Sequence, residues 1–307
     1  MTSRWLLRRL LGMVPTLLLT WTLVFLALHA IPGDPVTLML GGQPASQEVI
    51  EAERHRLGLD RPVGEQYVGF LGRAVVADFG ESFRTRQKVA TMIAEQAPYT
   101  VSLAFGGLLV GVVLGVSLGL LAGMRPEGWV DAAVMTTALA GLSLPSFWIG
   151  MLLIQVFATS LGWVPVLGTG PVALILPSIT VGLYLAGSLA RLVRASIIEA
   201  AGQDYVRTAR AKGLPPVRVV LRHIGRNAVI PPLTLLGTQF ALLIGGAVVT
   251  ERVFARPGLG AMLVDAVLTK DYPLVQGLVV VLTAAYIVIN LGIDLLYGVI
   301  DPRIARA

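Results

Sequence analysis

The sequence lacks cysteine entirely and is poor in charged side chains. Its 307 residues include no Cys, and charged residues make up 14% of the chain, against about 25% in soluble domains. The absence of cysteine excludes disulfides, iron–sulfur clusters, Cys-ligated zinc and cysteine nucleophiles. The mean hydropathy of +0.77 means that the chain has more apolar surface than a soluble protein of this size can bury, so we expect lipid to surround it.

The signatures of an enzyme are also missing. The three histidines form no HExxH motif, which excludes a zincin, and the sequence offers no catalytic or metal-ligating constellation. The only lysines, Lys88, Lys212 and Lys270, do not lie in a GxxxxGK[ST] motif, so this chain cannot bind ATP through a P-loop. We attribute the net charge of +6 to cytoplasmic loops and anionic lipid rather than to nucleic acid. The sequence therefore predicts a non-enzymatic membrane protein without a cofactor of its own.

Six apolar runs are long enough to cross a membrane, which takes about 20 residues. The first, from Leu10 to Ala30, follows three arginines and is too long for the core of a signal peptide, so we interpret it as an uncleaved span with the N-terminus inside. Ala132–Ala190 has no Asp, Glu, Lys or Arg, and the Gly- and Pro-rich residues 162–171 divide it into two spans. The other three runs are Val101–Met124, Asn227–Thr250 and Leu274–Ile293.

An even number of spans places both termini on the cytoplasmic side. The segment after the first span is then external, and we expect short amphipathic helices in it. Ser46 is a candidate N-cap of a helix that ends near Gly58, and Asp60 with Pro62 is a candidate start of another. The predicted parts are residues 1–31 (tail and first span), 32–97 (external loop), 98–300 (five-helix core with a cytoplasmic loop at 199–228) and 301–307 (cytoplasmic tail).

The cytoplasmic loop concentrates positive charge. From Arg191 to Arg226 there are eight Lys/Arg and two acids, so this connection alone has a net charge of +6. Positive loops stay in the cytoplasm, which agrees with the predicted orientation. Composition alone leaves two interpretations open, a docking surface for a cytoplasmic partner and a solvated basic loop that lies on lipid.

Glycine recurs every four residues in the second span. Small residues at this spacing let two helices approach closely in lipid, where there is little hydrophobic force between them. Plain packing within the chain is one explanation, and a helix that slides against its neighbours during transport is the other. The repeat consists of Gly107, Gly111, Gly115, Gly119 and Gly123.

Several separate motifs are spread over the chain. They are PGDPV at 32–36, LGLDRPVGEQY at 57–67, DYVRTARAKG at 204–213, HIGRNAVIPP at 223–232, ERVFARPGLG at 251–260, DYPLVQG at 271–277 and DLLYGVIDPR at 294–303. As a set they resemble the motifs of one family, the dipeptide/oligopeptide/nickel permeases of binding-protein-dependent ABC importers. The resemblance implies an all-α membrane protein with six transmembrane helices, the type I ABC importer fold and an external helical insertion after the first span.

In such permeases the loop before the fifth span couples to the ATPase through a short alanine-rich helix followed by glycine. Ala209 and Ala211 resemble the small residues that would seat in a partner's groove, and Gly213 resembles the glycine that ends the helix. Arg207 and Thr208 stand where the broad motif has Glu and Ala, and the interval from glycine to proline is longer. The implied coupling residues are Asp204, Tyr205, Arg207, Thr208, Ala209, Arg210, Ala211, Lys212 and Gly213.

The resemblance also implies partners and a location. These are a second homologous permease, two ABC ATPase subunits that bind ATP and Mg, and an extracytoplasmic substrate-binding protein, with the chain in a prokaryotic plasma (inner) membrane. Di- and oligopeptides are the expected substrates, and nickel chelates, opines, glutathione and oligosaccharides stay open. Thr234, Gln239 and Thr250 are candidates for the substrate pathway. An ATP-independent channel or secondary carrier is the alternative function.

Overall fold

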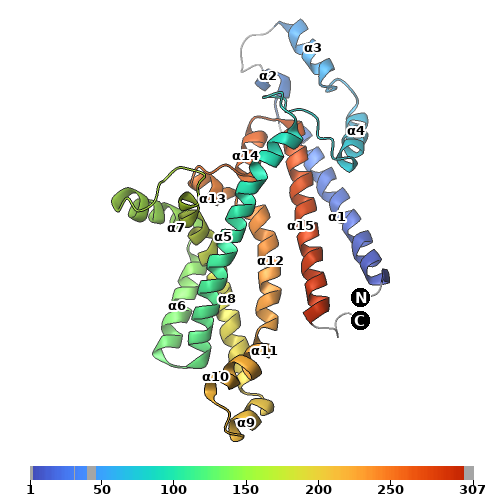
Figure 1. The fold of residues 1–307 in the computed structure, drawn as a ribbon. Helices are drawn as coiled ribbons and strands as arrows, with labels where there is room; N and C mark the ends of the chain where they lie inside the picture. The colour runs from blue at the N-terminus through green and yellow to red at the C-terminus, as the bar shows by residue number, and fades with distance from the viewer. Residues whose placement is uncertain (1–2, 31, 40–45, 301–307) are drawn as a thin grey trace. The chain divides into compact units, whose positions relative to one another are not determined.

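The computed structural model describes residues 3–30, 32–39 and 46–300, and in these ranges the chain is helical apart from turns, loops and one isolated bridge between Glu81 and Lys88 (Figure 1). The predicted all-α class is confirmed. The predicted cytoplasmic tail, 301–307, lies outside the described residues. The α-helices are α1 (Ser3–Ala30), α2 (Pro35–Met39), α3 (Gln47–Arg56), α4 (Val63–Val75), α5 (Val89–Met124), α6 (Trp129–Ser143), α7 (Ser146–Leu153), α8 (Ile175–Ala201), α9 (Asp204–Ala211), α10 (Pro216–Arg218), α11 (Gly225–Ala228), α12 (Ile230–Gly246), α13 (Val248–Val253), α14 (Leu259–Leu268) and α15 (Tyr272–Ile300). Shorter irregular turns are the π-helical η1 (Ile154–Ser160) and η3 (Val219–Ile224) and the 3₁₀-helical η2 (Val172–Leu174).

Four of the described helical stretches are long and apolar enough to cross a membrane, and a bent pair makes a fifth if it counts as one span. The fifth predicted run, Asn227–Thr250, is divided among α11, α12 and α13, and its longest helix, α12, has 17 residues. The predicted count of six spans is therefore not confirmed, although the helices agree with a multi-pass protein. The four stretches are Leu11–Ala30, Val89–Met124, Val172–Ala201 and Tyr272–Ile293.

A sharp bend interrupts the long uncharged run that begins at Ala132. The helical stretches Trp129–Ser143 and Ser146–Ser160 meet at 103°. Leu144 takes an extended conformation with ψ of 134°, because the ring of Pro145 disfavours a helical residue before it. The prediction that residues 162–171 alone divide this run was incomplete, since the proline introduces an earlier break.

The chain folds into two compact units that each combine two stretches of sequence. The first consists of residues 1–98 and 257–288, and the second of residues 99–256 and 289–307. Helices α5 and α15 each contribute to both units, and Pro98 lies inside α5 at the boundary.

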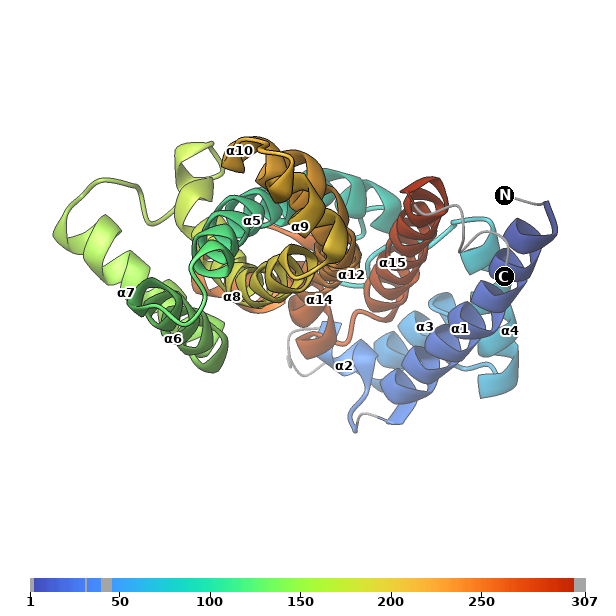
Figure 2. The same cartoon turned by 90° about the horizontal axis from the view of Figure 1, so that it is seen from below.

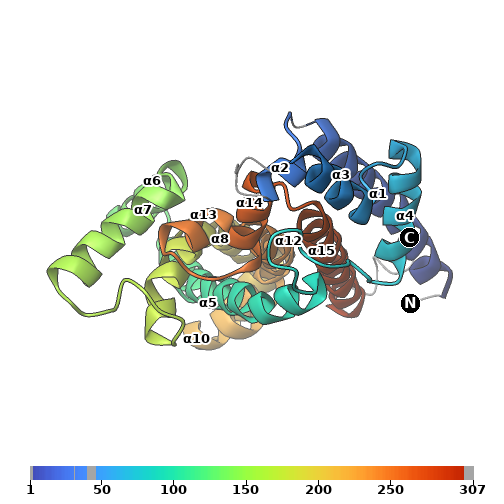
Figure 3. The ribbon, with the colours of Figure 1, turned by 90° about the horizontal axis from the view of Figure 1, so that it is seen from above.

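In the first unit, α3 and α4 confirm that the segment after α1 is helical. Ser46 caps α3 by accepting a hydrogen bond from the backbone of residue 49 at 3.4 Å, and Gly58, with φ of +68°, ends the helix in the left-handed region. The second predicted start differs in detail: Pro62 is the N-cap of α4 rather than its first residue, and Asp60 lies 3.7 Å from His55. Aromatic and alanine side chains of α4 pack on α1, which lies beside it in Figure 3.

Three consecutive residues, the first of α15 and the two before it, hold the first unit together. The Lys270 ammonium donates to two backbone carbonyls just after α1. The Asp271 carboxylate accepts a hydrogen bond of 2.5 Å from the Ser82 hydroxyl, and the Tyr272 hydroxyl donates to the carbonyl of Leu28 at 3.1 Å. Below them, α1, α5, α14 and α15 share a buried apolar cluster. Both α1 and the segment after it are therefore tied to residues late in the sequence.

In the second unit, the glycine repeat of α5 packs against α8. A Cβ placed on any of the five glycines would lie 2.5–3.0 Å from a side-chain atom of α8, so only glycine allows this approach. The residue opposite each glycine is numbered 74 higher, so the two helices run in the same direction in a constant register. The opposing residues are Val181, Leu185, Leu189, Val193 and Ile197.

Candidate functional site

The candidate coupling helix, α9, is built by its flanking residues. Gln203 precedes it in an extended conformation, and Asp204 in the first turn complements the positive end of the helix dipole. At the other end, Gly213 has φ of +72°, and the amides of Gly213 and Leu214 bond back to the carbonyls of residues 210 and 209 at 2.9 and 3.3 Å. This pair of bonds is a Schellman motif, which confirms that Gly213 ends the helix. Pro215 follows and caps α10 instead of extending α9.

The inner face of α9 packs on the protein itself. Val206 and Ala209 are buried in a cluster with side chains of α8, η3 and α11, and Leu214 packs against the same cluster. Ala209 was expected to seat in a partner's groove, but its side chain points into its own unit. Its small size instead lets α9 lie close to its own unit (Figure 2).

The outer face of α9 carries the other residues predicted for coupling, and it is exposed and mainly basic. Arg207 lies 3.6 Å from Asp204, and both side chains are largely in solvent, so this pair contributes little to stability. The arginine and lysine side chains are thus available to acidic groups on another protein. The exposed residues are Asp204, Tyr205, Arg207, Thr208, Arg210, Ala211, Lys212 and Gly213.

A hollow of about 360 Å³ lies beside α9, between it and the ends of α8 and α12. On its wall the amide nitrogen of Asn227 donates to the Tyr205 hydroxyl at 2.7 Å, which fixes α9 relative to the segment that returns to α12. Tyr205 was predicted from the sequence as a coupling residue and Asn227 was not, although Asn227 lies in the HIGRNAVIPP motif. The hollow is lined by Ser196, Glu199, Ala200, Gln203, Tyr205, Asn227, Ile230 and Pro231.

A partly buried ion pair, which was not predicted from the sequence, ties α6 to the same end of α8. The Arg194 guanidinium donates to both oxygens of Asp131, at 2.5 and 2.6 Å, and the backbone amide of Glu127 adds a third bond at 2.9 Å. Asp131 is 4% exposed, so its charge is compensated by these donors rather than by water. The sequence feature that could have indicated this pair is that Asp131 is the last acidic residue before a long uncharged run.

The three residues predicted for the substrate pathway are not brought together. The Thr234 hydroxyl is exposed and bonds to the carbonyl of Ile230 at 3.2 Å, and Gln239 is half-buried further along α12. The second unit contains a cavity of about 430 Å³ at the bend between α6 and α7. Of the three residues, Thr250 is the one that lines this cavity. Four other hydroxyl side chains line this space: Ser143, Ser146, Thr180 and Tyr184.

Among the described residues, no group of three or more His, Asp or Glu side chains is placed to hold a metal ion.

Comparison with known proteins agrees with this geometry. The model of the family "Binding-protein-dependent transport system inner membrane component" matches residues 115–306, and the model of its N-terminal region matches residues 2–104. The glutathione transport system permease protein GsiC of Escherichia coli (strain K12) is 44% identical over 299 residues, which cover 97% of each chain, and the protein of the same name from Shigella flexneri is equally similar.

Two solved structures share the fold at low sequence identity. The inward-facing MetNI methionine ABC transporter matches with a TM-score of 0.55 and 20% identity, over 69% of this chain and 97% of its own. An amino acid ABC transporter with histidines matches with a TM-score of 0.52 and 18% identity, over 70% of this chain and 94% of its own. The fold is thus that of ABC importer permeases, and the chain belongs to the family of inner membrane components of binding-protein-dependent transport systems.

Proposed function

We propose that this chain forms half of the membrane pathway of an ATP-driven importer of short peptides, including glutathione. The observation that carries the proposal is the 44% identity to GsiC, which extends over 97% of both chains and leaves no major segment unmatched. A peptide importer also agrees with the dipeptide and oligopeptide family that the motifs resemble.

As a permease of a binding-protein-dependent importer, the chain acts with a separate ATPase and a substrate-binding protein, and it is not itself an enzyme. We propose the stoichiometry of one second, homologous permease and two ATPase subunits, which bind ATP and Mg. The substrate-binding protein then delivers solute to the external segment 32–97, both termini are cytoplasmic, and the pathway lies between the two permeases.

The outer face of α9 is the proposed contact with the ATPase. Its exposed Arg207, Arg210 and Lys212 can pair with acidic groups there, while Val206 and Ala209 attach α9 to α8 and η3. A force on α9 is then transmitted to the spans because its inner face and the Tyr205–Asn227 bond are part of the packed unit. Closure of the two ATPases on ATP would move α9, and hydrolysis would reset it.

The first test is affinity purification of the tagged chain in mild detergent with mass spectrometry of its stoichiometric partners. Two ATPase copies and one related permease are expected. A stable monomer or homo-oligomer without ATPase would instead favour a channel or secondary carrier.

The second test separates the two faces of α9. We expect Ala209→Leu to impair both assembly and uptake, because the larger side chain cannot fit the buried cluster. The double variant Arg207→Gln/Arg210→Gln should fold normally but lose its association with the ATPase. The measurement is co-purification of the ATPase together with uptake of labelled glutathione and dialanine. Full ATPase association in the arginine variant would contradict the proposed contact.

A further inference from the structure

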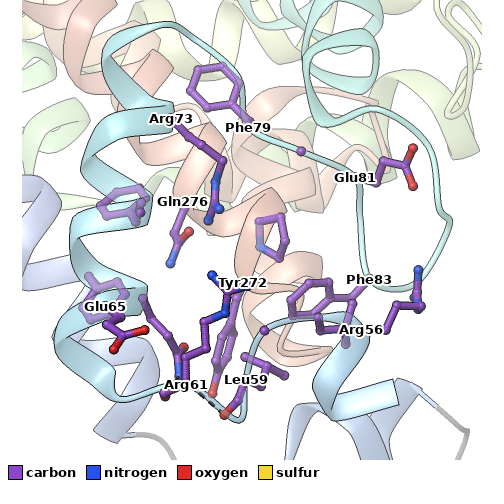
Figure 4. Close-up of a pocket in the computed structure, with 18 of the residues that line it drawn as sticks. Arg56, Leu59, Arg61, Glu65, Arg73, Phe79, Glu81, Phe83, Tyr272 and Gln276 are labelled. Carbon is purple, nitrogen blue, oxygen red and sulfur yellow. Dashed lines mark hydrogen bonds between the residues drawn. The ribbon is translucent and has the colours of Figure 1, made fainter. Parts of the chain in front are cut away.

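The first unit contains a cavity of about 440 Å³ that coupling does not use (Figure 4). It is partly open to solvent and is lined by the end of α3, the loop before α4, α4 itself, the loop at 79–83 and the start of α15. Binding sites for small molecules are concave, with an apolar base and a few polar groups, and typically have volumes of about 300–1,000 Å³. The cavity is thus large enough for a molecule of a few residues.

The base of the cavity is aromatic and rigid. Phe25 and Phe70 stack with their ring centroids 5.8 Å apart, and Phe83 lies 6.2 Å from Tyr272. Phe25, Phe70 and Tyr272 are each less than a tenth exposed, so they belong to the packed interior and form a fixed surface. Such a base favours the apolar parts of a ligand.

The walls carry exposed charges of both signs that make no hydrogen bond or ion pair with the described part of the chain, although Glu81 interacts electrostatically with Arg56. No hydrogen bond or ion pair engages the guanidinium groups of Arg61 and Arg73 there, nor the carboxylates of Glu65 and Glu81. The neighbouring Arg56 differs, because it donates to Glu53, outside the cavity, at 2.5 and 2.9 Å, and this bond lowers the pKa of Glu53.

These charges are arranged around the cavity rather than in one patch. Figure 4 shows Arg73 and Glu65 on the α4 wall, Arg61 near Tyr272, and Glu81 on the opposite loop. A ligand with charges of both signs at its two ends could therefore meet complementary groups.

Two amide side chains complete the walls and have different roles. Gln66 is already engaged, since its nitrogen donates to the carbonyl of Arg61 at 2.8 Å and its oxygen lies 3.2 Å from the His29 ring nitrogen. Gln276 reaches into the cavity from α15 without a hydrogen bond to the described residues, and its amide can both donate and accept. It is suited to a peptide group of a ligand.

We propose that this cavity binds a short peptide-like zwitterion. Its carboxylate would be held by Arg61 and Arg73, its ammonium group by Glu65 or Glu81, and its peptide group by Gln276. Guanidinium groups bind carboxylates with strong, directional hydrogen bonds, which gives the site its selectivity. The inference rests on the proposed function, which places this segment outside the membrane, and it adds a reception site on the permease itself.

The test is binding of radiolabelled trialanine, by equilibrium dialysis, to the purified importer complex without its substrate-binding protein. We expect saturable binding that weakens about tenfold or more in the double variant Arg61→Gln/Arg73→Gln, because charged hydrogen bonds are lost. The matched control is Arg84→Gln, an exposed arginine of the same external segment that does not line the cavity, and it should bind as wild type. The apparent melting temperature of each variant complex confirms that it is folded.

Two further probes define the ligand class. N-acetyl-trialanine amide, which has no charged ends, should bind about tenfold or more weakly than trialanine. Glycerophosphoethanolamine carries the charges of a phospholipid headgroup, and we expect it not to compete. Equal binding of the blocked peptide, or displacement of bound trialanine by the headgroup analogue, would overturn the assignment to peptides.

The same complexes, reconstituted with the substrate-binding protein, separate this inference from the proposed function. The cavity proposal would be overturned if trialanine is taken up but does not bind to the permease, or if its binding is unchanged in Arg61→Gln/Arg73→Gln. Either result would leave the importer function intact. Arginine-dependent binding without any peptide uptake would support the cavity and overturn the proposed function.

Discussion

The contact between Gly119 of α5 and α8 leads to a quantitative prediction. A Cβ on Gly119 would lie 2.6 Å from Val193 Cβ and 2.7 Å from the Ala190 carbonyl oxygen. The carbonyl belongs to the backbone of α8, so a rotamer change cannot relieve the contact. Reaching an ordinary contact of 3.4 Å requires the helices to separate locally by about 0.7 Å, and overpacking of this kind costs about 1–3 kcal/mol.

Gly119→Ala should therefore lower the apparent melting temperature of the detergent-solubilised complex, as followed by size-exclusion chromatography after heating. Alanine gains about 1 kcal/mol of helix propensity over glycine, which offsets part of the cost, so Gly119→Val should be clearly worse. The matched control is Gly12→Ala in α1, where no atom lies within 4 Å, and it should be neutral or slightly stabilising. Wild-type stability of Gly119→Ala and Gly119→Val would refute the packing argument.

Three other changes test different parts of the fold. Asp131→Asn should lower the apparent melting temperature of the complex, because it leaves the partly buried Arg194 without its charged partner, and Arg194→Lys should lower it less. Equal stability of Asp131→Asn and wild type in thermal unfolding would contradict a structural role. Gly213→Ala should cost about 1–2 kcal/mol of stability because alanine is strained at the positive φ of this residue, while no atom within 4 Å adds a steric clash. This variant should also reduce uptake, whereas Gly202→Ala, at an ordinary negative φ, should change neither stability nor uptake. Lys270→Met should make the external segment cleave faster in limited proteolysis, and an unchanged rate would show that the ammonium does not anchor it.

Local signals in the sequence were sufficient for much of the helical framework. Ser46 and Gly58 predict both ends of α3, and Gly213 predicts the end of α9, because capping depends on a few neighbouring residues. The bend after α6 had a local signal too, in Pro145, but a charge-free run dominated the interpretation. Composition identifies lipid-facing sequence without saying where a helix bends.

Features that depend on tertiary contacts were not predictable in the same way. Ala209 was expected to face a partner, yet it faces inward because Leu214 and the neighbouring helices complete a cluster around it. The pairing of Asp131 with Arg194 joins residues 63 apart, and no periodicity indicates it. Similarly, Thr250 borders the cavity at the bend between α6 and α7, whereas Thr234 is exposed on α12, and this difference depends on tertiary neighbours.

The Lys270–Tyr272 anchor has a consequence for the order of events during synthesis. Lys270 bonds to a carbonyl 238 positions earlier, so the first unit cannot close until nearly the whole chain has left the ribosome. At about 5–20 residues per second, α1 and the segment after it wait roughly 12–48 s for these partners. Most of the second unit is continuous from 99 to 256 and has no such delay. During that interval the early segment is a natural substrate for membrane chaperones and proteases, whereas the glycine-packed helices can already be assembled.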